Sequence, residues 1–500
     1  MLITQPQFWL LFWPLLLLTS YCLARSSIET RHWFWILASL GLYCVADFSG
    51  LPWLLLSLSI NAFIVAHLQR GWRGRKVMVA ASLIFNLSWM LVPAFRYGAE
   101  HNGSLLSHLA LAFLSLRQIW LLRDVCEARV IQTGLRRYLL FMLFFPHLLM
   151  GPLTRFNDLA KQFDAPGFAR PDFSQINPAL ILIACGLFKK IIIADSLARP
   201  IMMAFAAVND GQVLGWLEVW AVLVGFQFQL YFDFSAYSDI AIGLALMLGI
   251  HLPVNFFSPF RAFDRLDAWR RWHLSFVAFL KYNLFLPLRH YFPVPVLITI
   301  VGFASGLWHG MSTNFLLWSL SQALLLLASH ERRRVLRHFR LSAEGTGLRR
   351  ILQTVWVLAI SSLIGVFFIS VDLTQSLAIL QSALMPEHAS LPLRWLAKLG
   401  VEGVIPGIGG ANWVIPAWFV MVLPLCFCWV FLLPNTIQIL HGKVKFLTME
   451  RDTQILIQQE CAPKWLAGIP AVVWPALSGT LIVLTLWLSD SAAPFIYMRF

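Results

Sequence analysis

The sequence predicts an all-α polytopic membrane protein, and three observations lead to this fold class. Of the 500 residues, 59% are hydrophobic and only 12% are charged, whereas soluble proteins carry about 25% charged residues. The mean hydropathy is +0.72. Apolar stretches long enough to cross a bilayer recur along the whole chain. We therefore expect roughly 10–13 transmembrane helices, with re-entrant or interfacial helices beside them, in a single integral-membrane domain over residues 1–500.

The expected membrane segments follow one another closely. In the first half they lie at 8–24, 33–47, 52–68, 77–95, 104–122, 138–152, 177–206, 213–232 and 239–254. In the second half they lie at 276–288, 293–309, 314–330, 351–371, 414–434 and 466–488. Several are short or contain Gly and Pro. Non-helical backbone at membrane depth is tolerated only where it is buried in protein or lines a cavity, so these breaks indicate an internal cavity.

The basic residues predict the orientation. The formal net charge is +14, and such an excess concentrates in cytoplasmic loops of membrane proteins. Residues 69–76 hold four basic residues and no acid, and residues 331–350 hold seven arginines and two glutamates. With both segments inside, both termini and the 372–413 loop lie outside. We interpret the Gly- and Pro-rich part of that loop, 403–410, as a plain loop or as a contact for an acceptor. No nucleic-acid partner is expected, because no soluble fold presents the basic residues.

His309 is the strongest catalytic candidate. It lies in FASGLWHGMSTNF, between Gly306 and Gly310, near the end of an apolar segment. Ionisable residues in membrane segments are costly, so a functional role is the default hypothesis. The glycines permit close approach of a ligand, and a neutral imidazole can take a proton from a hydroxyl. No H-x-x-x-H or C-x-x-C spacing is present, so no metal site is predicted.

The segment FDRLDAWRRWHLSF, 263–276, is predicted to form one amphipathic helix at the membrane interface. Its apolar face would consist of Trp269, Trp272, His273 and Phe276. On another face, Asp267 can pair with Arg271 four residues later. From this pattern alone, His273 fits a hydrogen-bonded structural histidine better than a catalytic one.

Other polar residues lie inside or beside apolar runs. Asp233 and Asp239 are six residues apart and do not share a helical face, so we expect them to orient neighbours such as a histidine or backbone N–H groups. Lys189 and Lys190, in GLFKKIIIAD (186–195), are expected at a helix end, where they either extend to the interface or bind a donor. Helix breaks are predicted at 144–156 and 253–260.

The order of these segments resembles that of the membrane-bound O-acyltransferases. The motifs are FFPHLLMGPLTRF, GLFKKIIIAD, FDFSAYSDIAIGLALMLGI, PVNFFSPF, WRRWHLS, SGLWHG and PFIYMRF. Together they are most similar to the bacterial alginate O-acetylase-like branch, and more distantly to the teichoic acid D-alanyl transferases. The chain departs from the branch in a shortened loop, HYFPVPV, and in 109–125, which lacks the usual proline and glycine. These departures affect the expected acceptor or partner more than the chemistry.

The resemblance implies a helical bundle around a central tunnel in the bacterial inner membrane. It implies His309 as general base, or as the residue that hands the acyl group on through a partner's hydroxyl. It implies His273 as a second required histidine, which would position the donor or support the transition state. The expected supporting or donor-binding residues are Trp269, Arg271, Trp272, Trp308, Asp233, Tyr237, Asp239, Asn255, Lys189 and Lys190. No bound cofactor is expected. Acetyl-CoA, or another acyl thioester, would be the donor substrate.

The implied reaction is O-acetylation of an exported polysaccharide such as alginate or cellulose. The expected partners are the lipid bilayer, a periplasmic or membrane-anchored acetyltransferase and the polysaccharide export machinery. Four alternatives stay open at this point: acetylation of peptidoglycan, D-alanyl transfer to teichoic acid, a transporter or flippase with a His/Asp proton relay, and a membrane scaffold without enzymatic activity.

Overall fold

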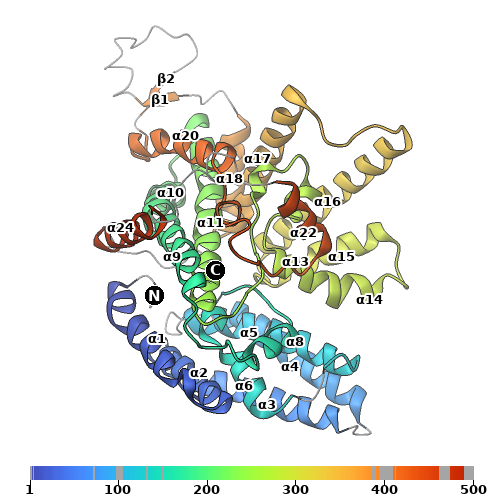
Figure 1. Ribbon diagram of the computed structural model, residues 1–500. Coiled ribbons are helices and arrows are strands. Elements are labelled where there is room, and N and C mark those ends of the chain that lie inside the picture. Colours follow the sequence, from blue (N-terminus) through green and yellow to red (C-terminus); the bar gives the residue numbers. More distant parts are fainter. Residues whose placement is uncertain are drawn as a thin grey trace.

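The computed structural model describes residues 3, 5–70, 74–96, 105–130, 133–148, 150–385, 390–392, 409–411, 413–460 and 473–488. Nearly all regular structure in these ranges is helical (Figure 1), which confirms the predicted all-α fold class. Two short parallel strands, β1 (Ser390–Pro392) and β2 (Gly409–Ala411), are the exception in the described part. Most of the predicted 403–410 loop lies outside the described residues.

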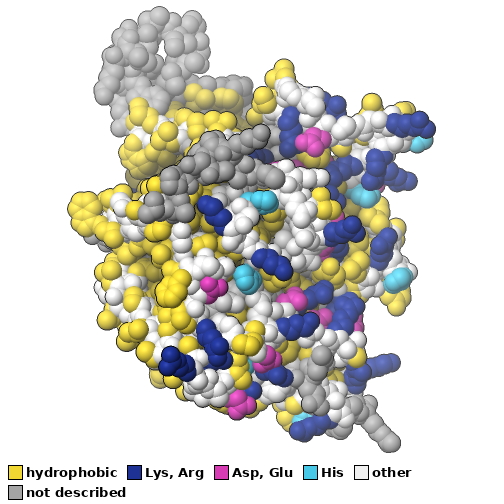
Figure 2. All heavy atoms as spheres, in the orientation of Figure 1, with side chains coloured by type: hydrophobic (Ala, Val, Ile, Leu, Met, Phe, Trp, Pro, Cys, Tyr) yellow, Lys and Arg dark blue, Asp and Glu magenta, His cyan; other side chains and the backbone are white. Residues whose placement is uncertain are grey.

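Within the described residues, three helical segments are long and apolar enough to cross a membrane: Phe8–Arg25, Leu51–Gln69 and Gly347–Ile369. Four shorter apolar helical segments accompany them: Leu274–Leu288, Val294–Leu307, Ala417–Leu432 and Val473–Trp487. On the face seen in Figure 2, hydrophobic side chains gather on the left, and most Lys and Arg side chains lie on the right. Exposed apolar residues of α1 (Trp13–Cys22) and α24 (Val473–Trp487) contribute to such surface, as expected for helices that contact lipid.

The N-terminal region is a layer of helices at the bottom of Figure 1. Besides α1, it consists of η2 (Phe8–Phe12), η3 (Leu23–Arg25), α2 (Ile28–Ala46), α3 (Leu51–Gln69), α4 (Arg75–Arg96), α5 (Leu105–Cys126), α6 (Leu135–Leu143), α7 (Phe145–Leu148) and α8 (Phe156–Phe163). The predicted break at 144–156 is confirmed, because α7 is a single turn and irregular backbone follows it up to α8. α5 carries the side chains by which this layer contacts the site.

The long helix α11 (Trp216–Leu246) runs through the centre of Figure 1. Its 31 residues give a length of about 46 Å, more than the roughly 30 Å bilayer core. The prediction of two separate segments, 213–232 and 239–254, was therefore wrong. The polar residues between them do not break the helix, because buried partners on the preceding helices neutralise them.

Those partners lie on one continuous helical rod built from α9 (Phe173–Leu187), η4 (Phe188–Ala194) and α10 (Asp195–Asn209). α9 packs closely on α11 because two glycines lie at the contact. A Cβ on Gly186 would approach the Ile240 side chain to 2.6 Å, and one on Gly243 would approach the Ala179 carbonyl to 2.8 Å.

The second half of the chain surrounds the other side of α11. Its elements are η5 (Pro259–Arg261), α12 (Arg265–Trp269), α13 (Leu274–Leu280), η6 (Lys281–Phe285), α14 (Leu286–Leu288), α15 (Val294–Leu307), α16 (Thr313–His338), α17 (Gly347–Ile369), α18 (Leu373–Leu384), α20 (Ala417–Leu432), α21 (Thr436–Ile439) and α22 (Arg451–Gln459). The expected single helix over 263–276 was wrong, because the chain turns between α12 and α13. The turn places His273 at the start of α13.

Candidate functional site

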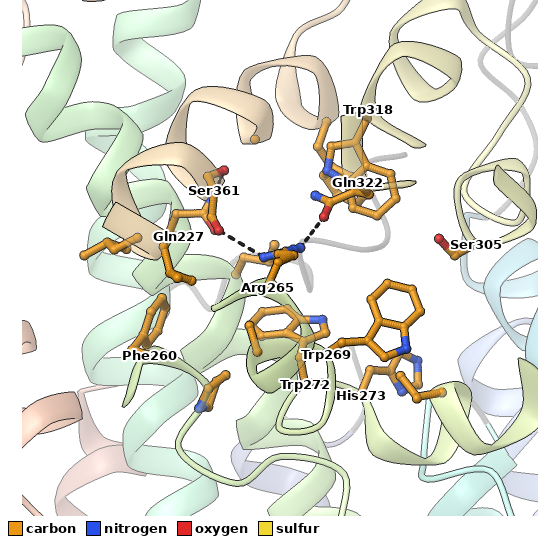
Figure 3. Close-up of a pocket in the computed structure, with 18 of the residues that line it drawn as sticks. Gln227, Phe260, Arg265, Trp269, Trp272, His273, Ser305, Trp318, Gln322 and Ser361 are labelled. Atoms are coloured by element: carbon orange, nitrogen blue, oxygen red, sulfur yellow. Dashed lines mark hydrogen bonds between the residues drawn. The ribbon is translucent and has the colours of Figure 1, made fainter. Parts of the chain in front are cut away.

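A cavity of about 110 Å³ lies where α11, α12, α13, α15, α16 and α17 meet, and both candidate histidines line it. Its wall is largely apolar, and several aromatic side chains contribute to it (Figure 3). The aromatic lining residues are Phe226, Phe260, Trp269, Trp272, Phe276, Trp318 and Phe368. The sequence had placed His273 and His309 in separate segments, and the fold brings them to one apolar chamber.

His273 is held in a left-handed backbone conformation, with φ 45° and ψ 51°. Such a conformation is uncommon for a residue with a Cβ and persists where the surroundings determine it. Here the preceding loop does so. The Leu274 N–H donates to the Asn255 carbonyl at 2.9 Å, and the Phe257 N–H donates to the Arg271 carbonyl at 2.9 Å. The bend between α12 and α13 is thereby tied to the loop that follows α11.

The side chain of Asn255 fixes the tautomer of His273. Asn255 Oδ1 accepts the backbone N–H of Ser275 at 3.2 Å, and Asn255 Nδ2 donates to Ser238 Oγ at 3.2 Å. The amide oxygen therefore faces His273, whose Nδ1 lies 3.0 Å away. An oxygen can only accept, so His273 Nδ1 carries the hydrogen and Nε2 keeps a lone pair. Nε2 is buried with no hydrogen-bond partner among the described residues.

His309 follows the end of α15 in a turn, as the sequence predicted. Its ring contacts Trp318 and Phe368 edge-on, with centroids 5.2 Å and 4.9 Å apart. The two flanking glycines have steric reasons to be there. A Cβ on Gly306 would approach the Ser319 Cβ to 2.0 Å. Gly310 has φ +153°, and a Cβ added to it would approach the Phe315 ring to 2.8 Å.

The Trp308 ring packs against the rings of both histidines. Its ring centroid lies 4.6 Å from the His309 ring and 6.3 Å from the His273 ring. Phe113 of α5 packs edge-on against Trp308 and stacks on His273 from the N-terminal layer. A displacement of α15 or α5 would therefore change the positions of the imidazoles.

The opposite wall of the cavity is polar. Arg265 of α12 donates from Nη1 to Ser361 Oγ of α17 at 3.0 Å and from Nη2 to Gln322 Oε1 of α16 (Figure 3). Gln227 of α11 lies beside them. The sequence interpretation missed these four residues. Three are polar residues inside apolar runs, the same signal that identified Asp233. Arg265 precedes Trp269 by four residues and so shares its helical face.

The predicted lysines and acids are not in the cavity wall. Lys189 Nζ pairs with Asp239 at 2.7 Å, and Lys190 Nζ pairs with Asp233 at 2.7 Å and with Asp195 at 2.7 Å. Both lysines are buried in the middle of the rod, in the π-helical segment η4. The expectations of a helix-end position and of extension to the interface were therefore wrong. Both acids pair with lysines in the described part of the chain, and donor binding by the lysines stays a prediction.

The remaining predicted residues divide between the wall and its support. Trp269 and Trp272 line the cavity. Asn255 lies behind His273, and Tyr237 is buried on α11. Arg271 is buried and pairs with Asp267 at 3.1 Å, which confirms the predicted pair, and also with Glu460 at 2.6 Å.

Comparison with known proteins places the cavity inside a matched region. A family model described as MBOAT, membrane-bound O-acyltransferase family, matches residues 106–369. The cavity-lining residues, from Phe226 to Phe368, all fall within that range.

Curated relatives are similar over parts of their length. The peptidoglycan O-acetyltransferase of Helicobacter pylori is 28% identical over 431 residues, 76% of this chain and 79% of that protein. A Pseudomonas putida protein named probable alginate O-acetylase AlgI is 29% identical over 290 residues, 57% of this chain and 56% of that protein. The teichoic acid D-alanyltransferase of Bacillus subtilis is 25% identical over 239 residues, 45% of this chain and 59% of that protein.

Proposed function

The chain belongs to the membrane-bound O-acyltransferase family and is an O-acyltransferase, and we propose that it moves an acetyl group from cytoplasmic acetyl-CoA for O-acetylation of an exported polysaccharide. The observation that carries this proposal is the shared cavity of His273 and His309. Two imidazoles in one largely apolar chamber can accept and donate a proton where bulk water is reduced.

The proposed acyl transfer conserves atoms and charge and requires neither a metal ion nor a redox partner. An imidazole nitrogen takes the proton of an acceptor hydroxyl, and the oxygen bonds to the thioester carbonyl carbon. The carbon–sulfur bond then breaks, the acyl group stays on oxygen, and the thiolate leaves and receives a proton. Correct placement of donor and acceptor can supply several kcal/mol, on the order of 7–11 at best.

His309 was expected to be the general base. The hydrogen bonds give His273 the same capacity, because its Nε2 lone pair is available while Nδ1–H is bound to Asn255. We therefore propose that proton acceptance belongs to this pair of histidines, with Asn255 orienting one of them and Trp308 separating them. The expectation that His273 positions the donor or supports the transition state stays a prediction.

The acceptor is proposed from the names of the relatives. Two of them are named for O-acetylation, of peptidoglycan and of alginate, which favours acetyl over the D-alanyl group of the teichoic acid enzyme. A cavity reached from both membrane faces would join a cytoplasmic thioester to a polymer outside. A separate periplasmic or membrane-anchored acetyltransferase is proposed to complete the transfer. Membership of an acyltransferase family leaves the transporter and scaffold alternatives without support.

The test measures acetyl content of the cell wall and the secreted polysaccharide in bacteria that express His309→Ala, His273→Ala or the unmodified chain at equal membrane levels. Each variant is expected to lose acetyl by roughly 10²-fold or more, the usual contribution of a general base. His290→Ala, which alters an exposed histidine, is the matched control and should keep full acetylation. Unchanged acetyl content in both cavity variants would overturn the proposed function.

A further inference from the structure

Arg265 brings a positive charge to the cavity, and no carboxylate of the described residues pairs with it. Its hydrogen bonds to Ser361 and Gln322 use two of the five N–H donors of a guanidinium. Its Nε atom is buried without a hydrogen-bond partner among the described residues. Arg265 as a whole is half-buried, and a half-buried cation whose buried donor lacks a partner is stabilised when an anion completes its environment.

The nearby acids are bound to other arginines. Asp264 accepts two hydrogen bonds of 2.6 Å from Arg333 of α16, and Asp267 pairs with Arg271. None of the residues described as lining the cavity is Asp or Glu. In the described part of the chain, no carboxylate lies within ion-pair distance of Arg265 either. The arginines next to Arg265 thus have carboxylate partners within the protein, whereas the charge of Arg265 is available to a ligand.

We propose that Arg265, with Gln227, Gln322 and Ser361, is the subsite that binds an anionic group, a carboxylate or a phosphate, of the substrate that reaches the two histidines. Arginine binds both groups well, because its planar donors match their oxygens. The flanking amides and hydroxyl add neutral donors and acceptors around the anion. This inference rests on the proposed function, since that function places substrate in the cavity.

The anion has two possible sources. One is the thioester donor, whose nucleotide carries phosphates, and the other is an acceptor sugar that carries a carboxylate. The position of α12 favours the donor. Arg333, which binds Asp264 next to Arg265, belongs to the 331–350 segment that the charge distribution predicts to be cytoplasmic. Arg265 would bind a phosphate and a carboxylate in the same way, so an experiment is needed to separate the two sources.

Binding can be measured on the purified full chain in detergent through quenching of tryptophan fluorescence, because Trp269, Trp272 and Trp318 line the cavity. The probes are acetyl-CoA, S-acetylpantetheine, glucuronate and glucose. S-acetylpantetheine lacks the phosphates of acetyl-CoA, and glucose lacks the carboxylate of glucuronate. Each pair therefore differs in the anion.

Arg265→Gln is expected to weaken binding of the anionic probe by about 10- to 100-fold, the range for a charge-assisted hydrogen bond. A loss for acetyl-CoA without a loss for S-acetylpantetheine assigns the anion to the donor. A loss for glucuronate without a loss for glucose assigns it to the acceptor. Arg265→Lys should retain part of the binding. Equal affinities of Arg265→Gln and the unmodified chain for all four probes would overturn the proposal.

Two controls keep the result interpretable. Arg270→Gln removes an exposed arginine only five residues away and should bind all probes normally. Thermal unfolding of each variant checks that Arg265→Gln is folded, and Ser361→Ala tests the subsite while the charge stays in place. Because binding is read without turnover, normal anion binding by a chain that does not acetylate would contradict the proposed function and leave this subsite intact.

Discussion

Asn255 is the residue on which the chemistry of His273 depends. Its amide has two possible orientations, and they would give His273 opposite tautomers. The Ser275 N–H can only donate, so it selects the orientation that presents Oδ1 to the imidazole, and the Ser238 hydroxyl accepts from Nδ2 in that orientation. The backbone of α13 thus determines that Nε2 is the basic nitrogen.

Asn255→Ala is expected to lower kcat on the order of 10²-fold, because His273 would no longer be held with its lone pair in the cavity. KM should change little, since the cavity wall is intact. Asn255→Asp, which keeps an oxygen facing Nδ1, should recover part of the rate. Acyl transfer by purified chains measures both. Equal losses in the two variants, or a loss confined to KM, would contradict the orienting role.

The residue scale also shows where the sequence was informative. His309 could be identified from its own surroundings, because an ionisable residue between glycines in an apolar segment is unusual. The role of Arg265 could not. Its importance depends on Ser361 and Gln322, which come from helices far along the chain, and on the absence of a carboxylate among the described lining residues.

At the scale of the helical elements, the pair α15 and α16 determines the position of His309. Gly302 and Gly306 of α15 form a G-x-x-x-G pattern, which allows close backbone approach between membrane helices. A Cβ on Gly302 would approach the Ala323 Cβ to 2.7 Å. His309 lies less than one turn beyond Gly306, so the spacing between these helices also sets the position of the imidazole.

Gly306→Ala is therefore expected to reduce stability by about 1–3 kcal/mol, the cost of overpacking, and to reduce acyl transfer because α15 must shift. Thermal unfolding and turnover in detergent measure the two effects. The matched control is Gly41→Ala in α2, where nothing lies within 4 Å of the added methyl. That variant should be neutral or slightly more stable. A Gly306→Ala chain with normal stability and activity would show that α15 adapts without moving the site.

The helices illustrate why the elements were only partly predictable. Apolar length located most segments correctly, since it depends on local composition alone. It failed at α11, because the continuity of that helix depends on Lys189 and Lys190, some fifty residues earlier, which neutralise Asp239 and Asp233. It failed again at 263–276, where the helical spacing was present but the loop around Asn255 imposes a turn.

At the scale of the whole molecule, the structure relates several loops to one another. Gln375 of α18 donates to the Phe205 carbonyl of α10 at 2.7 Å, and Trp220 of α11 donates to the Ala383 carbonyl at 3.1 Å. The α10–α11 turn therefore lies near α18, which the charge distribution predicts to be outside. The arginine-rich 331–350 segment lies near α12 instead, through Arg333 and Asp264.

Fusions test this orientation. Alkaline phosphatase, which is active only outside the cytoplasm, should be active when joined after Gly211 and inactive after Ser342, both exposed turn or loop positions. A fluorescent protein that folds only inside should give the opposite pattern. Reversed signals would show that the orientation in the membrane is opposite to the predicted one. The Arg265 end of the cavity would then face the acceptor side. The orientation of the chain in the membrane thus decides whether the donor or the acceptor reaches the Arg265 side of the cavity.

The contacts of the 447–460 segment have a consequence for the order in which the enzyme is made. The Val254 N–H bonds to the Leu447 carbonyl, Lys281 pairs with Glu450, and Arg271 pairs with Glu460. These late residues support the bend that carries His273. At a synthesis rate of about 5–20 residues per second, residues 447–460 leave the ribosome on the order of 10 s after the bend. During that interval the nascent chain already holds both histidines but lacks the contacts that support the His273 bend, so acyl transfer should begin only near the end of synthesis.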